Sequence, residues 1–181
     1  MVVIAISGPP GSGKTTQAKL IAKYFGLEYY SAGNIFREIA RKRGLSLEEL
    51  SRIALEDPSI DLEIDRRTYE IASTRDNIVL DGHLVAWIVS DIADYKVYLT
   101  APLPIRVKRI AQRDGISLEK AMRETIIREY YEKMRFIKYY GINVDDLSIF
   151  DLVIRVDKLG IEEVFETIKV FLEKSLKSSR I

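Results

Sequence analysis

The chain has 181 residues, with 28 Lys and Arg against 27 Asp and Glu, and a formal net charge of +1 at pH 7. This near-neutral charge provides no overall positive field, so we expect neither a nucleic-acid partner nor a membrane partner. Cysteine is absent, which excludes disulfides, thiolate metal sites and a cysteine nucleophile.

The length fits one domain, and a hydrophobic fraction of 47% supports a buried core. No apolar run approaches the roughly 18 residues that a transmembrane helix needs. Met1 is followed directly by an apolar segment of strand length, without the basic residues that open a signal peptide. We therefore expect a single domain over residues 1–181, located in the cytoplasm.

Predicted strands and helices alternate along the chain. The predicted strands are Val2–Ile6, Glu28–Tyr30, Asn77–Leu80, Lys96–Leu99 and Leu152–Val156. The predicted helices are Gly13–Phe25, Gly33–Arg43, Ser46–Glu56, Ile60–Ser73, Leu103–Gln112, Ser117–Tyr140 and Ile161–Ser178. Continuously apolar strands are typical of a parallel sheet that is covered on both faces. The pattern predicts an α/β fold, a three-layer sandwich around a parallel sheet of about five strands.

A glycine-rich segment directly after the first strand contains Gly-x4-Gly-Lys-Thr, the P-loop pattern of nucleotide-binding proteins. Its glycines let successive backbone N–H groups surround a polyphosphate, and Lys14 can reach the β- and γ-phosphates. The Thr15 hydroxyl can ligate Mg²⁺. The position between a strand and a helix favours nucleotide binding over a glycine-rich turn that binds nothing. The predicted donor-binding residues are Ser7, Gly8, Pro9, Pro10, Gly11, Ser12, Gly13, Lys14, Thr15 and Thr16.

Residues 33–75 form a helical insertion between the second and third strands, much longer than a crossover requires. We expect it to stand over the phosphates as a second binding wall, beside a core of residues 1–32 and 76–181. Arg37 lies one turn into its first helix, near a predicted anion site. The alternative is a helix cap at Ser31 or Asn34 with Arg37 facing solvent.

Two later helices each carry a face of arginines. Arg106, Arg109 and Arg113 recur at i, i+3 and i+7, so they share one helix face. Arg128 and Arg135 share a face of the next helix, where ordinary surface ion pairs Glu124–Arg128 and Glu132–Arg135 are the alternative interpretation. Because the two faces flank a short turn, they predict a helical lid around residues 113–136.

Together these segments resemble the nucleoside monophosphate kinases. The resemblance rests on the P-loop GPPGSGK, on SAGNIFR from Ser31 to Arg37, and on the lid entry from Arg109 to Arg113. The Arg66-Arg67 pair, the segment from Ile142 to Leu152 and the overall size are most similar to the archaeal-type cytidylate kinases.

The resemblance implies transfer of the ATP γ-phosphoryl group to CMP or dCMP, with Mg²⁺ as the metal. It implies catalytic roles for Lys14, Arg109, Arg113, Arg128 and Arg135. It implies substrate binding by Ser31, Gly33, Arg37, Gly82 and His83. Thr15 would ligate the metal directly and Asp81 through water. No general base is needed, because the attacking phosphate oxygen is already ionised.

Two residues depart from common patterns of such kinases. His83 stands where relatives often carry Arg, which leaves a hydrogen-bonding residue, a pH-sensitive cation and a bystander as alternatives. Asn34 stands where adenylate kinases commonly have Asp, which argues against AMP as acceptor.

Other functions remain open from the sequence. A kinase for UMP, AMP or a shikimate-like acceptor is one alternative, and a nucleotide-dependent switch or adaptor is another. The Asn-Lys-x-Asp motif of guanine-binding switches is absent from the chain. We expect small-molecule nucleotides as the only partners, and a monomer.

Overall fold

A computed structural model of the protein describes residues 2–178. Its centre is a five-stranded sheet with the order β2-β3-β1-β4-β5, in which every neighbouring pair is parallel. The strands are β1 Val3–Ser7, β2 Glu28–Ser31, β3 Ile78–Asp81, β4 Tyr95–Thr100 and β5 Leu152–Arg155. The predicted parallel sheet is therefore confirmed.

Helices connect and cover these strands. They are α1 Lys14–Phe25, α2 Ala32–Lys42, α3 Leu47–Glu56, α4 Ser59–Thr74, α5 Val85–Ile88, α6 Leu103–Asp114, α7 Leu118–Tyr140 and α8 Ile161–Ser178. Sequence patterns missed α5, a single turn of apolar residues that is too short to show helical periodicity. Val156, predicted as the end of the last strand, instead begins the 3₁₀ turn η1 Val156–Lys158. In the part of the chain that the structure describes, no helix is both long and apolar enough to cross a membrane.

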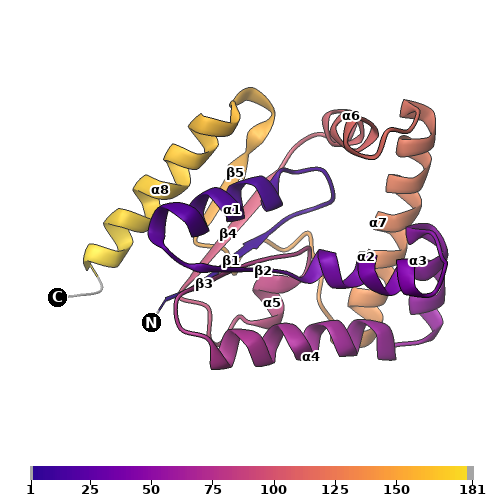
Figure 1. The fold of residues 1–181 in the computed structure, drawn as a ribbon, viewed down its shortest axis with the longest axis horizontal. Helices are drawn as coiled ribbons and strands as arrows, with labels where there is room; N and C mark the ends of the chain where they lie inside the picture. Colours follow the sequence, from indigo (N-terminus) through magenta and orange to yellow (C-terminus); the bar gives the residue numbers. More distant parts are fainter. Residues whose placement is uncertain (1, 179–181) are drawn as a thin grey trace.

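The sheet is the middle layer of a three-layer sandwich. Ile4 and Ile6 of β1 pack with α1 and α8 on one face, whereas Val3 and Ala5 pack with α4 and α5 on the other. Figure 1 shows α1 and α8 lying across the sheet, with α4 and α5 below it. Both sets of β1 side chains are buried, which explains why the strand is continuously apolar.

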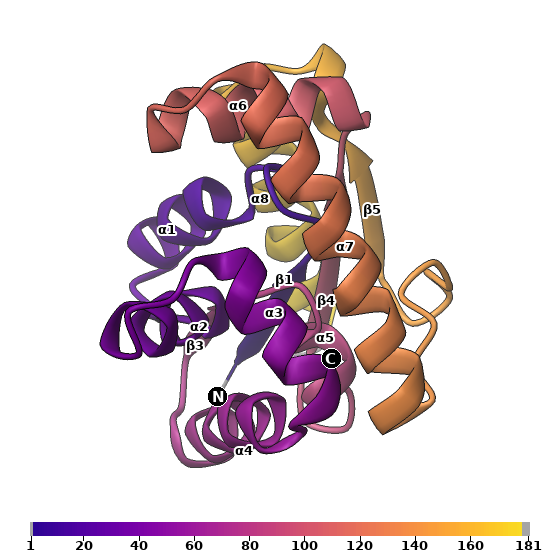
Figure 2. The ribbon, with the colours of Figure 1, turned by 90° about the vertical axis from the view of Figure 1, so that its right-hand side faces the viewer.

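Helices α2, α3 and α4 extend beyond the sheet and have their own small core, which includes Phe36, Leu50 and Ile64. The first turn of α3 is held by a capping box, in which Ser46 and Glu49 exchange hydrogen bonds. Helix α3 packs against the C-terminal half of α7, and Figure 2 shows the two helices side by side. The insertion therefore rests on α7 as well as on the sheet.

Helices α6 and α7 form a hairpin that carries the predicted lid. Gly115, with φ 66°, ends α6, and Ser117 caps α7 by accepting a hydrogen bond from Lys120 N at 3.2 Å. Val107, Ile110 and Ala121 form the apolar contact between the two helices. Helix α7 continues far past the hairpin, so its two ends have different neighbours.

Candidate active site

The P-loop joins β1 to α1 in a conformation that depends on glycine. Gly8, Gly11 and Gly13 have φ values of 146°, 78° and 92°, where side chains are strained. A Cβ on Gly8 would lie 2.1 Å from the carbonyl oxygen of Leu99, and one on Gly11 would lie 2.6 Å from that of Arg106. Glycine thus lets the loop pass close to β4 and α6.

Lys14 occupies the first position of α1, inside the curve of the loop. Its Nζ donates a hydrogen bond to the carbonyl oxygen of Pro9 at 2.9 Å. Burial lowers the pKa of Lys14 to about 8, against the opposing charge of Asp81. A phosphate anion near Nζ would favour the charged ammonium, so this site is electrostatically suited to a polyphosphate.

Thr15 and Asp81 bring two oxygen donors together from different elements. The Thr15 hydroxyl donates to Oδ2 of Asp81 at 2.6 Å, and the Tyr29 hydroxyl donates to Oδ1 at 3.0 Å. Burial and the nearby Asp81 charge raise the pKa of Tyr29 to about 12, so it remains a donor. Sequence reasoning missed Tyr29, because no local pattern places it against a carboxylate 52 positions away.

A cavity of about 700 Å³ opens over the loop and is lined by both the predicted donor-binding and the predicted substrate-binding residues. Its walls come from the P-loop, α2, the end of β3, α6, α7 and the segment before α8. The predicted residues that line it are Pro10, Gly11, Ser12, Gly13, Lys14, Thr15, Thr16, Ser31, Gly33, Arg37, Asp81, Gly82, His83, Arg109, Arg113 and Arg128. The structure therefore brings together groups that are far apart in the sequence.

Ser7, Gly8 and Pro9, which were predicted donor-binding residues, are not among the residues that line the cavity. The Ser7 hydroxyl accepts a hydrogen bond from Ala86 N at 3.0 Å, which ties the end of β1 to α5. These three residues shape the base of the loop.

Arg135, for which the resemblance implies a catalytic role, does not line the cavity. Its Nε donates to Asp61 of α4 at 2.6 Å and its Nη1 to the carbonyl oxygen of Ser51 of α3 at 3.1 Å. The prediction correctly placed Arg128 and Arg135 on one helix face, but seven residues advance a helix by about 10 Å. That distance moves Arg135 from the cavity to the insertion, where it is 2% exposed.

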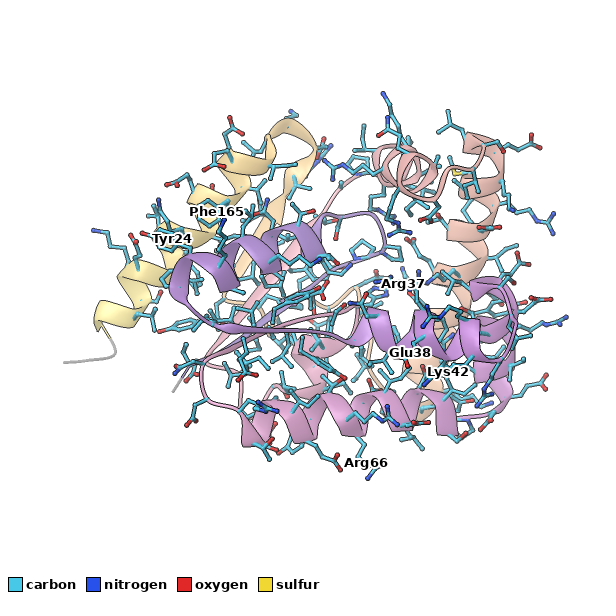
Figure 3. The ribbon with its side chains drawn as sticks, in the orientation of Figure 1. Tyr24, Arg37, Glu38, Lys42, Arg66 and Phe165 are labelled. Atoms are coloured by element: carbon cyan, nitrogen blue, oxygen red, sulfur yellow. The ribbon has the colours of Figure 1, made fainter. Side chains whose placement is uncertain are left out.

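Four arginines from three helices line the cavity: Arg37 of α2, Arg109 and Arg113 of α6, and Arg128 of α7. Burial and then the charges of Arg113 and Arg128 lower the pKa of Arg37. Figure 3 shows Arg37 on the side of α2 that faces the loop, whereas Arg66 of α4 points away from the molecule. The Asp114 carboxylate also lines the cavity and pairs with Arg113 at 2.7 Å, so it offsets part of this positive charge, and a bound anion would offset more of it.

The α6 arginines differ in how many protein partners they have. Arg106 is buried, donates to the carbonyl oxygens of Ala101 and Pro10 at 2.9 and 3.0 Å, and pairs with Glu129. Among the described residues, Arg109 makes only long contacts of 3.4 Å, to the carbonyl oxygens of Gly11 and Val156. Arg106 therefore holds the hairpin to the loop, and Arg109 retains capacity for a ligand.

His83 and Arg128 meet at a buried carboxylate. Nδ1 of His83 lies 2.6 Å from Oε2 of Glu132, and Nε of Arg128 donates to Oε1 at 2.8 Å. Burial raises the pKa of Glu132, but the charges of Arg128 and His83 outweigh this and hold it well below the usual range. The alternative interpretation, surface ion pairs Glu124–Arg128 and Glu132–Arg135, is wrong. Arg128 pairs with the buried Glu132, and Oε1 of Glu124 lies 3.8 Å from Nζ of Lys120.

The two glycines of the predicted acceptor site differ in their surroundings. A Cβ on Gly82 would lie 3.1 Å from Cβ of Ala32, so glycine allows α2 to pack against the end of β3. A Cβ on Gly33 would meet nothing closer than Nη1 of Arg37 at 3.6 Å. Among the described residues, packing therefore favours glycine at position 82 but leaves room for a side chain at position 33.

This arrangement defines a class of protein. A P-loop follows the central β1, a carboxylate ends the adjacent β3, and a helical insertion and an arginine-bearing hairpin face the loop across one cavity. The fold and the site are those of a P-loop kinase.

Comparison with known sequences identifies the family. A family model described as the cytidylate kinase-like family matches residues 3–158. Cytidylate kinase from Staphylothermus marinus is 70% identical over 177 residues, which cover 98% of this chain and 99% of that protein. Cytidylate kinase from Desulfurococcus amylolyticus is 62% identical over 177 residues, covering 98% and 96%. The chain belongs to the cytidylate kinase-like family.

Solved structures support the fold at much lower identity. Shikimate kinase from Bacteroides thetaiotaomicron has a TM-score of 0.61 at 16% identity, covering 95% of this chain and 98% of that one. A gluconokinase from Sinorhizobium meliloti has a TM-score of 0.61 at 12% identity, covering 91% and 87%. At such identities the likeness concerns the fold of P-loop kinases and not the acceptor.

Proposed function

We propose that this chain transfers the γ-phosphoryl group of ATP to CMP, giving ADP and CDP, and that it also accepts dCMP. It is a nucleoside monophosphate kinase, as its family and its relatives indicate. The observation that carries the proposal is the cavity in which Lys14 faces Arg37, Arg113 and Arg128. This much positive charge suits two phosphate-bearing substrates that meet between the P-loop and the helices.

On the donor side, the backbone N–H groups of the loop and the Lys14 ammonium would bind the ATP phosphates. The Thr15 hydroxyl and the Asp81 carboxylate fit Mg²⁺, which prefers oxygen ligands and retains water and phosphate ligands. Among the described residues no cluster of three or more His, Asp or Glu could hold a metal alone. When bound, Mg²⁺ would neutralise charge on the transferring phosphates.

On the acceptor side, Arg37 would bind the monophosphate, with Ser31, Gly33, Gly82 and His83 forming its pocket. The attacking phosphate oxygen needs no base, so the protein acts by positioning the substrates and by neutralising charge. Arg109, Arg113 and Arg128 would contact the transferring group, and the hairpin end of the predicted lid, residues 113–136, would close over it. The insertion of residues 33–75 would form the opposite wall.

Both binding sites are built from one chain, so the proposed reaction needs no second copy. We therefore propose a monomer that acts in the cytoplasm on small-molecule nucleotides. No nucleic-acid partner is part of the proposal, because the formal net charge of the chain is only +1.

The test is a turnover assay of the purified protein with ATP and Mg²⁺ across CMP, dCMP, UMP, AMP and shikimate. We expect the highest kcat/KM with CMP or dCMP and formation of the corresponding diphosphate. Turnover of another acceptor without turnover of either cytidine nucleotide would refute the proposal. Nucleotide-dependent binding of a partner protein without any turnover would instead favour a switch.

A further inference from the structure

Glu132 lies on α7 directly behind the arginine that faces the cavity. We propose that Glu132 is a positioning residue, which orients the Arg128 guanidinium toward the phosphate of the acceptor nucleotide. The inference rests on the proposed function, because it concerns the acceptor side of that site. Glu132 is 3% exposed and is not among the residues that line the cavity, so it would act through Arg128.

The geometry of the carboxylate supports this role. Oε1 of Glu132 accepts from Nε of Arg128 at 2.8 Å, and Oε2 lies 2.6 Å from Nδ1 of His83. Each oxygen is thus held by a group from a different part of the chain, which fixes the plane of the carboxylate. His83 in turn packs edge-on against Phe136, with ring centroids 5.6 Å apart.

The guanidinium of Arg128 is bound by the protein at Nε, which leaves its other two nitrogens available to a ligand. Within residues 2–178, Nη1 and Nη2 of Arg128 have no hydrogen-bond partner. Cζ of Arg128 lies 5.8 Å from the centroid of the Phe36 ring. A carboxylate bound at Nε leaves the Nη1–Nη2 edge of the fork free for two phosphate oxygens. Arg128 therefore has the orientation of a phosphate-binding arginine.

Arg135 provides the contrast on the same helix. Its Nε and Nη2 both donate to Asp61, at 2.6 and 3.4 Å, and its Nη1 donates to Ser51 O at 3.1 Å. This guanidinium is fully used by the protein and holds α7 to the insertion. The two buried carboxylate–arginine pairs of α7 thus differ: Arg128 keeps two guanidinium nitrogens for a ligand, whereas all three nitrogens of Arg135 are bound by the protein.

Electrostatic repulsion explains why Arg128 needs a carboxylate behind it. Its charge lies close enough to Lys14 and Arg37 to lower the pKa of both, alongside their burial. Without Glu132, like charges would push the guanidinium away from the cavity. The negative charge of Glu132 offsets this repulsion and keeps Arg128 in the cavity wall.

The experiment compares Glu132→Gln with the matched control Asp61→Asn. Both changes neutralise a buried carboxylate that binds an α7 arginine, but only Glu132 holds an arginine of the cavity. We expect Glu132→Gln to raise KM for CMP by about 10-fold to 100-fold, with KM for ATP within about twofold of wild type. Asp61→Asn should lower the melting temperature without raising KM for CMP. Wild-type turnover on CMP tests the proposed function separately.

A double-mutant cycle with Arg128→Lys tests whether the effect passes through Arg128. Lysine keeps a positive partner for Glu132 but lacks the two-pronged fork. If Glu132 acts by orienting that fork, Glu132→Gln should change KM for CMP by less than about threefold in the Arg128→Lys background. The inference would be overturned if the KM increases caused by Glu132→Gln and by Arg128→Lys multiplied in the double variant. It would also be overturned if Asp61→Asn raised KM for CMP as much as Glu132→Gln does. Glu132→Asp, which keeps the charge, replaces Glu132→Gln if the latter does not fold, and should give a smaller increase.

Discussion

The two sides of the site are built in opposite ways. The P-loop side is local, since ten consecutive residues supply the turn, the lysine and the hydroxyl that we propose as a metal ligand. The proposed acceptor side is assembled from α2, α6, α7 and the end of β3, which lie far apart in the sequence. On this side, residues of the same type have different environments: Arg128 faces the cavity, whereas Arg135 is locked into the insertion. Residue type and helical spacing define a loop site well, but they do not separate binding arginines from structural ones.

Arg135→Ala tests the C-terminal half of α7, where Arg135 binds the insertion, and it should have the largest effect on free energy. The change leaves Asp61 buried and unpaired and removes a hydrogen bond to Ser51 O, which should cost about 3 to 5 kcal/mol of unfolding free energy. Denaturant titration measures this loss. At a temperature where the variant is folded, KM for ATP should remain near the wild-type value. A stable variant with impaired CMP binding would place Arg135 with the binding arginines instead.

Lys14→Ala tests the P-loop side. The ammonium should stabilise charge that develops on the transferring phosphoryl group, so we expect kcat to fall about 100-fold or more, equivalent to about 3 kcal/mol. Steady-state kinetics with CMP and ATP measure the effect, and circular dichroism checks the fold. Near-normal kcat in a folded variant would contradict the assignment of the donor site.

Arg37→Ala tests the acceptor side, with Arg66→Ala as its control. Loss of a charge-assisted contact to the monophosphate should raise KM for CMP about tenfold and leave KM for ATP nearly unchanged. Arg66 pairs with Glu70 on the surface and has a side chain that is 69% exposed, so its removal should change neither KM. Equal increases for both substrates in Arg37→Ala would move this residue out of the acceptor site.

Asp65→Asn tests a smaller effect in the contact between α4 and α7. Burial raises the pKa of Asp65 to about 7, and Tyr140 donates a hydrogen bond to its Oδ2 at 2.5 Å. The protonated form is favoured in the folded state, so its stabilising effect is present below the unfolded pKa of about 3.9 and lost as pH rises through about 7. Wild type should therefore lose stability relative to Asp65→Asn between about pH 4 and pH 8.

The shift from about 3.9 to about 7 corresponds to at most about 4 kcal/mol, and because the Asp65 side chain is half-buried we expect a relative change of about 1 to 2 kcal/mol over that range. Denaturant titrations at several pH values measure it. Asp76→Asn, at an exposed position before β3, is the control and should show no such pH dependence. A pH-independent difference between wild type and Asp65→Asn would show that the carboxyl group titrates normally.

Local pattern was sufficient for most of the fold. The continuously apolar strands, the long amphipathic helices and the P-loop glycines predicted the parallel sheet and the loop, and the structure confirms the fold. Helix α5 was missed because its buried residues Val85 and Ala86 belong to a single apolar turn, which has no polar face to reveal its period. The last strand ends one residue earlier than predicted, since Val156 turns into η1.

What the sequence by itself determined was the part of the predicted site that is encoded in neighbouring residues: the P-loop, its lysine and its hydroxyl. Tertiary structure alone decided the pairings across long separations, such as Tyr29 with Asp81 and His83 with Glu132, which are 52 and 49 positions apart. It also decided that Arg128 faces the cavity while Arg135, two turns further along α7, binds Asp61. The physical reason is that a helix fixes the direction of a side chain, whereas the elements packed against each turn determine whether that side chain meets a ligand, a carboxylate or solvent.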